Sequence, residues 1–248
     1  MLETLVINLA EREDKWNEIR ESFSRWPVQL ERLDAVRMKP GWKGCAASHL
    51  KAIRLAKERG LDMVIILEDD ALLVPGGIER FETLLPVLKA RRKEWDIFLG
   101  GATFLEDLQT VSLVPPLYRA RAYTTHFTLV NGAAFDKILD GYDPDGDIQI
   151  DEFYRTNLIL WMTNPHIAIQ RSGLSDIGDK VEDYNIHFDK ATSDMTYAIW
   201  HLFILYLLYA LFVFFILLLF SKEVMEGYDS VIAAVASYLK KRGGRIRA

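Results

Sequence analysis

Several features are scarce in this 248-residue sequence, and each scarcity excludes a class of protein. Cysteine occurs once, at Cys45, which excludes an intramolecular disulfide and a cysteine-rich metal site and points weakly to a reducing compartment. Lys and Arg number 30 against 35 Asp and Glu, a net charge of −5, so we expect no nucleic-acid partner. The N-terminus also lacks a secretory signal core, because its short apolar run is followed at once by charged residues.

The apolar residues make up 50% of the chain but are unevenly distributed. Residues 197–220 read YAIWHLFILYLLYALFVFFILLLF, where His201 is the one residue outside the apolar and aromatic set and no side chain has a fixed charge. A run of this length can span a bilayer, with Tyr197 and Trp200 at the level of the lipid headgroups. A buried core helix is the alternative, but it would normally show a polar stripe. The sequence therefore predicts a single transmembrane helix.

The transmembrane segment divides the charge of the chain. Residues 221–248 hold six Lys or Arg against three acids, a net charge of +3, which leaves −8 on residues 1–220. Apolar positions of this tail, such as Met225, Tyr228 and Ile232, recur on one helical face, so we expect an amphipathic helix on a membrane surface or against a partner. The predicted parts are a catalytic domain over 1–192, a span over 197–220 and a tail over 221–248.

The orientation in the membrane stays open at this point. A C-terminal anchor with no earlier targeting segment favours a cytoplasmic catalytic domain. The basic cluster that follows the anchor also favours the cytoplasmic side of the membrane. The domain before a single span and the cluster after it cannot both be cytoplasmic, so the two signals conflict.

Short apolar runs alternate with longer amphipathic ones in residues 1–195, a pattern typical of an α/β domain with a mostly parallel sheet. Strands are predicted at 4–9, 28–33, 63–67, 95–99, 126–130 and 166–170, and helices at 11–26, 44–59 and 132–140. Residues 172–194 are polar and lack periodicity, which predicts a closing loop or linker.

Three acids, Glu68, Asp69 and Asp70, follow the fully apolar run MVIIL. Open α/β sheets bind ligands at the carboxyl ends of their strands, and a divalent cation relieves the mutual repulsion of crowded carboxylates. These acids therefore predict an Mg²⁺ or Mn²⁺ site completed by water and substrate phosphate. Acids in this position also cap helices or face solvent, so that reading remains an alternative.

The segments VINLAEREDKW, RLDAV, GWKGCAASHLKAIRLAKERG and VIILEDDALL together resemble glycosyltransferase family 25, which includes lipooligosaccharide and collagen galactosyltransferases. The resemblance is dense over residues 5–74, thinner to 170 and absent beyond. It implies a GT-A type, Rossmann-like single domain, a UDP-sugar donor and inverting transfer to a hydroxyl, in lipopolysaccharide or other glycan biosynthesis.

The resemblance also implies roles at the donor site. Asp69 and Asp70 would be metal ligands, with Glu68 beside them, and would neutralise the diphosphate as it leaves. Asn8 would read the uracil, and Arg12 would meet a phosphate or remain a solvated charge. Two further positions match the family motif, Ser48 and His49, which would bind the donor or hold neighbouring loops by hydrogen bonds.

An inverting transferase needs a base for the acceptor hydroxyl, and the resemblance places it at Asp151 or Glu152. Asp151 can also cap the helix predicted over FYRTNLIL. His187 is a candidate late metal ligand, with His126 and His166 as less favoured choices. Gln170, together with residues 175 and 176, resembles a family position near the donor sugar.

The leading hypothesis is thus an inverting hexosyltransferase, galactose being favoured, that uses a UDP-sugar and a divalent metal at a membrane. The acceptor would be a hydroxyl of a glycan, a lipid-linked sugar or a protein. The rival is a degenerate transferase fold kept as a membrane-tethered binding or assembly module. A metal-dependent phosphohydrolase is disfavoured, since no second motif supplies His and Asp at metal spacing.

Overall fold

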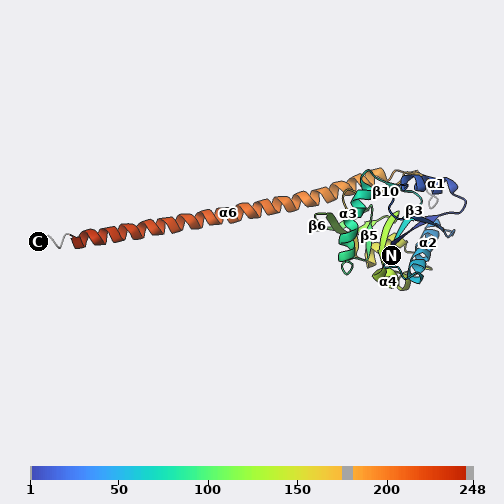
Figure 1. The fold of residues 1–248 in the computed structure, drawn as a ribbon, viewed down its shortest axis with the longest axis horizontal. Helices are drawn as coiled ribbons and strands as arrows, with labels where there is room; N and C mark the ends of the chain where they lie inside the picture. Colours follow the sequence, from blue (N-terminus) through green and yellow to red (C-terminus); the bar gives the residue numbers. More distant parts are fainter. Residues whose placement is uncertain (1, 175–180, 244–248) are drawn as a thin grey trace. The chain divides into compact units, whose positions relative to one another are not determined.

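In the computed structural model of the chain, which describes residues 2–174 and 181–243, the central feature is an eight-stranded sheet with the strand order β2-β1-β3-β8-β5-β9-β7-β6 (Figure 1). β1 pairs in parallel with β2 and β3, and β5 pairs in parallel with β9, whereas β8 and β7 run in the opposite direction. The protein is therefore a mixed α/β fold with a mostly parallel sheet, as predicted. The strands are β1 (Leu2–Asn8), β2 (Leu30–Asp34), β3 (Met63–Glu68), β5 (Ile97–Leu99), β6 (Thr103–Leu113), β7 (Pro116–Tyr123), β8 (Phe127–Asn131) and β9 (Leu160–Met162).

Helices cover both faces of this sheet, which explains why β3 has no polar alternation. Val64 and Ile66 of β3 belong to one apolar cluster, with side chains of α2, α4 and α5. Ile65 and Leu67 point the other way, into a second cluster with α3 and the residues in and after α1. The helices are α1 (Glu13–Ser22), α2 (Gly41–Glu58), α3 (Gly77–Ala90), α4 (Phe135–Gly141) and α5 (Ile150–Asn157), and a short 3-10 turn, η1 (Gly132–Ala134), precedes α4.

The structure corrects three of the predicted elements. The helix expected to run from Phe153 to Leu160 ends at Asn157, because Leu158 is extended (φ −123°, ψ 158°) and Leu160 enters the buried strand β9. The strand expected at 166–170 shortens to β10 (Ala168–Gln170) and pairs with β4 (Ala71–Leu73) outside the central sheet. The prediction of a linker at 172–194 was wrong, since this segment contains the paired strands β11 (Gly173–Leu174) and β12 (Val181–Glu182) and the start of a helix.

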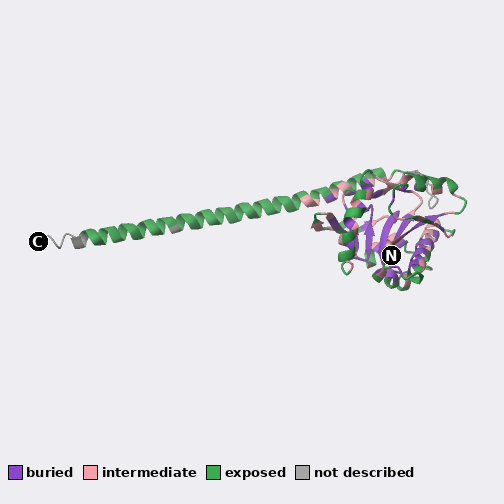
Figure 2. Ribbon diagram, viewed as in Figure 1, coloured by how far each residue is buried: buried purple, intermediate pink, exposed green. Residues whose placement is uncertain are grey.

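The last helix, α6 (Asn185–Gly243), begins in the α/β unit, which comprises Met1–Ile199. Phe188, Ala191 and Met195 are buried there, so this unit continues past the expected boundary at 192. The second unit, Trp200–Ala248, holds the rest of α6, and its described side chains from 200 to 240 are all exposed (Figure 2). By length and composition this helix can cross a membrane. Arg245 and Arg247 of the tail lie outside the described residues.

Candidate active site

A cleft of about 1030 Å³ opens where β1 and β3 end, at the edge of the sheet that the sequence predicts for ligand binding. Its walls come from the segment between β2 and α2, the first turns of α2, the acids after β3, the start of β6, the end of β7 and the start of α5. Of the predicted site residues, those that line it are Asn8, Ser48, Glu68, Asp69, Asp70, Asp151 and Gln170.

Glu68 is the acid held most firmly by neighbouring side chains. Its Oε1 lies 3.1 Å from Nε2 of the fully buried His49 and accepts a hydrogen bond from the Thr125 hydroxyl. Burial acts to raise the pKa of Glu68, but the hydrogen bonds from His49 and Thr125 outweigh it and lower that pKa below its usual value. Glu68 is therefore an anion fixed at the floor of the cleft, and His49 positions it.

Asp69 lies between an amide and an ammonium group. Asn8 Nδ2 donates to Asp69 Oδ2 at 2.7 Å, and Lys15 Nζ lies 3.6 Å from Asp69 Oδ1. Because Asn8 ends β1 and Lys15 belongs to α1, this contact joins the first two elements of the fold to the acid cluster. Asn8 thus orients a carboxylate in this structure.

Asp70 is the acid whose charge is least compensated. Gln170 Nε2 donates to its Oδ2 at 3.0 Å, whereas its Oδ1 is buried and has no hydrogen-bond partner among the described residues. Burial first, and then the negative charges of Glu68 and Asp69, raise the pKa of Asp70 to about 7. The Gln170 amide and the charge of Lys15 act in the opposite direction but offset only part of this cost, so an added cation would stabilise anionic Asp70.

The oxygen atoms around Asp70 suit a divalent cation. Asp70 Oδ1 and Asn8 Oδ1 are both buried without a partner among the described residues, and both are hard oxygen donors of the kind that Mg²⁺ and Mn²⁺ prefer. With Asp69 beside them, these groups can hold a cation whose remaining positions are filled by water and phosphate. The residues present therefore fit the expected metal.

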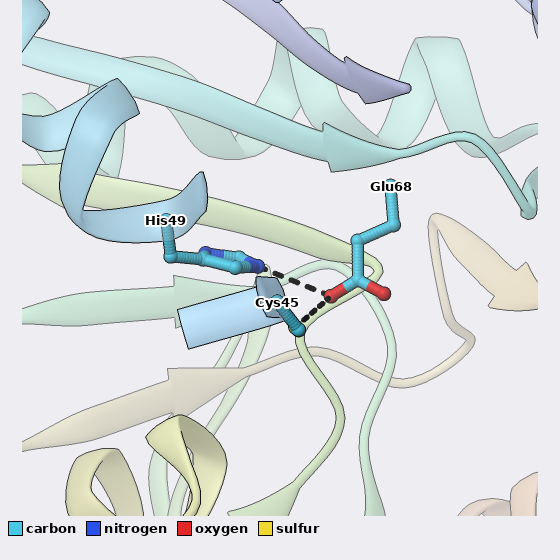
Figure 3. A group of neighbouring side chains, drawn as sticks. All are labelled: Cys45, His49 and Glu68. Atoms are coloured by element: carbon cyan, nitrogen blue, oxygen red, sulfur yellow. Dashed lines mark hydrogen bonds and ion pairs between the residues drawn. The ribbon is translucent and has the colours of Figure 1, made fainter. Parts of the chain in front are cut away.

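A second set of potential ligands lies deeper. Cys45, His49 and Glu68 bring one ligand atom each to within 4.8 Å of one another (Figure 3). The Glu68 oxygen of this set already accepts hydrogen bonds, and burial together with the charge of Glu68 raises the pKa of the Cys45 thiol well above its usual value. The atoms of this cluster are thus already engaged with one another, whereas Asp70 Oδ1 has no partner among the described residues.

Ser48 shapes the wall of the cleft. Its hydroxyl donates to the Gly44 carbonyl at 2.7 Å and accepts from the Val36 amide at 2.8 Å, which fastens the segment after β2 onto α2. Gly44 allows this approach, since a Cβ there would lie 2.4 Å from the Val36 carbonyl oxygen. Ser48 thus holds a neighbouring loop and also lines the cleft, and its contact with a donor stays a prediction.

The two candidate bases point to different places. Asp151 lines the cleft, and burial raises its pKa, as the charge of Glu68 also does. It does not occupy the N-cap position, because α5 begins at Ile150 after Gln149, but its Oδ1 accepts a hydrogen bond from the Glu152 amide of the first turn at 2.8 Å, as the capping alternative expected. Glu152 is not among the residues that line the cleft.

Glu152 instead belongs to a network beside the cleft. It accepts a hydrogen bond from the Tyr123 hydroxyl at 2.5 Å and forms an ion pair with Arg155 at 3.1 Å, and both contacts lower its pKa. Asp151 is thus the better placed of the two to take a proton inside the cleft.

Arg12 and His187 each contact a residue that lines the cleft. The Arg12 guanidinium bonds to Asp14, with Nε 3.0 Å from Oδ1, while its backbone carbonyl accepts from Asn8. The His187 ring packs 4.4 Å from the Phe104 ring, and neither Arg12 nor His187 is among the residues that line the cleft. Residues 175 and 176 fall outside the described part of the chain.

His126 and His166, the less favoured ligand candidates, are buried in the interior. Their rings pack on Phe188 at 5.3 Å and 5.4 Å, and burial lowers both pKa values to about 4. They serve the packing of the start of α6.

Sequence reasoning missed several residues of the cleft. Lys15 follows the first strand within the quoted segment VINLAEREDKW, and a cation one helical turn into α1 is a signal that could have identified it. Phe104 and Tyr123 gave no such signal, because they lie in β6 and β7, which the sequence pattern did not predict. Thr125 lies just before β8, a strand that was predicted, but a threonine there gave no signal of its own.

The chain was also compared with known proteins. No protein-family model matches it. Among curated proteins it is similar to procollagen galactosyltransferase 1-B of Xenopus laevis, with 27% identity over 183 residues. The match covers 61% of this chain and 30% of the relative, so the chain spans under a third of that protein's length.

Solved structures give more distant matches. A glycosyltransferase involved in the glycosylation of the major capsid of PBCV-1 shares 10% identity, with a TM-score of 0.37 over 55% of this chain and 62% of that one. Mannose-1-phosphate geranyltransferase from Thermus thermophilus shares 12% identity, with a TM-score of 0.38 over 65% of this chain and 73% of that one.

Proposed function

We propose that the chain is an inverting glycosyltransferase with a GT-A type domain of the family 25 kind. It transfers a hexose, with galactose favoured, from a UDP-sugar to a hydroxyl of a glycan, a lipid-linked sugar or a protein. The name of the Xenopus laevis relative supports galactose as the sugar to test first.

One observation supports this proposal above the others. Three carboxylates, Glu68, Asp69 and Asp70, follow one another at the end of a buried strand and line a cleft large enough for a nucleotide sugar, and Asp70 keeps a buried oxygen without a partner among the described residues. Keeping such charges buried is unfavourable for stability, which is typical of functional sites. A binding module has no need of them.

The residues divide into three roles. Lys15 borders the phosphate end of the donor, where its ammonium group stabilises added negative charge, and Asn8 orients Asp69. Asp151 takes the proton from the acceptor hydroxyl while that oxygen bonds to the anomeric carbon, and the bond from this carbon to the diphosphate breaks, releasing UDP. A divalent cation bound by Asp69 and Asp70 would supply positive charge to the leaving diphosphate.

Helix α6 supplies the membrane part of the proposal. We place residues 197–220 in a bilayer as a single C-terminal anchor, which would raise the local concentration of an acceptor that is itself held at the membrane. A cytoplasmic catalytic domain stays part of this proposal, to be tested by protease protection of sealed vesicles.

The test uses the full chain in a mild detergent, because α6 contributes buried residues to the α/β unit. UDP release is measured with a panel of UDP-sugars, with Mn²⁺ and with EDTA. We expect metal-dependent release from one sugar, lost in Asp70→Asn and retained in Asp145→Asn, which changes an exposed loop acid. A folded chain that neither binds nor cleaves any UDP-sugar would overturn the proposal in favour of the tethered module.

A further inference from the structure

The rim of the cleft next to Asp151 is aromatic. Phe104, at the start of β6, lines the cleft and is 54% exposed. Tyr123, at the end of β7, also lines it, and the two rings meet edge to face with centroids 6.1 Å apart. An exposed phenylalanine alone is ordinary, so its geometry and surroundings decide whether it has a role.

The backbone at this rim is strained. Phe104 has φ +50° and Thr124, directly after Tyr123, has φ +93°, and both residues line the cleft. Bulky and β-branched residues rarely adopt such angles, which cluster at ligand-binding sites. A glycine at position 104 would remove this strain. The chain has a phenylalanine there instead, although the backbone angle at this position is unfavourable for that residue.

Neighbouring groups fix the orientation of the aromatic pair. Arg155 lies over the Tyr123 ring at 4.8 Å, and the Tyr123 hydroxyl donates to Glu152. His187 packs on the Phe104 ring at 4.4 Å with an interplanar angle of 40°. Glu152 and His187, predicted as a base and a metal ligand, thus both contact the aromatic pair, and the remaining surface of Phe104 borders the cleft.

We propose that Phe104 is the stacking platform for a pyranose ring of the acceptor, so that the acceptor is a neutral glycan whose hydroxyl is presented to Asp151. The inference rests on the proposed function and names its acceptor class. The axial C–H groups of a hexose form an apolar face that suits the electron-rich face of an aromatic ring. The cleft is lined by both acids and bases, but the Phe104 ring itself has no charge and suits an uncharged sugar ring.

The test measures acceptor binding without turnover. The full chain in detergent is saturated with UDP and Mg²⁺, and saturation-transfer NMR is recorded with methyl β-D-galactopyranoside, methyl β-D-glucopyranoside and N-acetylserine methylamide as probes. We expect a glycoside to receive saturation at its axial ring protons, with loss of the signal in Phe104→Gly and retention in Phe104→Tyr. Leu113→Ala, which removes another exposed apolar side chain of β6, is the matched control and should behave as the wild type.

The outcomes separate this inference from the proposed function. Phe104→Gly should unfold at the wild-type temperature or above, because glycine accepts φ +50°, and its acceptor KM should rise about tenfold or more. Binding of UDP without saturation of either glycoside, or signals unchanged in Phe104→Gly, would overturn the glycan platform. Saturation of the serine amide instead would assign the rim to a protein acceptor, and a wild-type chain that binds no UDP would overturn the proposed function itself.

Discussion

Replacing Asp70 by asparagine should stabilise the folded α/β unit while removing its metal affinity. The pKa of Asp70 is about 7 in the folded chain against 3.8 for a free side chain, so ionised Asp70 is destabilising. Between these two values the folded state binds more protons than the unfolded state, and stability is lost as pH rises; above pH 7 the full cost is present. Asparagine keeps an acceptor for Gln170 and has no charge to desolvate.

The size of the effect follows from the separation of the two pKa values. At 1.36 kcal/mol per pKa unit, the gain in Asp70→Asn has an upper limit of about 4 kcal/mol at pH 8 and falls to about 1 kcal/mol at pH 4.5. Urea unfolding of the full chain in detergent with EDTA, followed by tryptophan fluorescence, measures it. Asp145→Asn is the control and should change stability by less than about 0.5 kcal/mol at either pH.

A divalent cation should narrow the difference in stability between the two proteins. At a concentration 100 times its Kd, Mn²⁺ stabilises the wild type by about 2.7 kcal/mol, whereas Asp70→Asn should gain little. A destabilised Asp70→Asn at pH 8 without metal would refute the reasoning, since it would mean that the buried carboxylate is already compensated within the protein. An equal Mn²⁺ response in both proteins would refute the assignment of Asp70 as a ligand.

Four further predictions concern the core and the cleft. Phe81→Ala, in a fully buried aromatic cluster, should lower the free energy of unfolding by about 3 to 5 kcal/mol in the same urea assay, and a loss below 1 kcal/mol would contradict the packing. Gly44→Ala should cost about 1 to 3 kcal/mol and weaken UDP binding by calorimetry, because its Cβ meets the Val36 carbonyl; unchanged binding would speak against this wall. Asp151→Asn should reduce transfer about 10²- to 10⁴-fold with the chain still folded, and near-normal transfer would exclude Asp151 as the base. The pKa of His166 is about 4 against 6.5 unfolded, so it removes about 3 kcal/mol of stability as pH falls from 6.5 to 4, and His166→Gln should flatten this part of the curve.

The strands nearest the cleft were predictable because they are apolar and lie between clear helices. β1 and β3 match the expected runs, and the rule that ligands bind at strand carboxyl ends placed Glu68 and Asp69 at the correct edge. The hairpin of β6 and β7 was not predictable, because positive φ angles at Phe104 and Asp107 and shifts of register interrupt the alternation. β9 was missed since its three residues directly follow a helix.

The site was harder to predict than the fold. Whether Asp151 or Glu152 enters the cleft depends on the residue at which α5 begins. If the helix began one residue earlier or later, its side chains would be rotated by about 100°. Gln149, not Asp151, precedes the helix, so Asp151 faces the cleft and Glu152 faces Tyr123. The contact of Lys15 with Asp69 depends in the same way on the start of α1.

The pairing of β4 with β10 has a consequence for the order in which the protein matures. The Arg171 amide donates to the Asp70 carbonyl at 2.8 Å, and Gln170 binds the Asp70 side chain, so both restraints come from residues about 100 positions later in the chain. During synthesis, β1, β2 and β3 can pair before those residues leave the ribosome. The final shape of the acid cluster therefore depends on residues 168–171, which are synthesised long after the acids themselves and shortly before the apolar segment of α6.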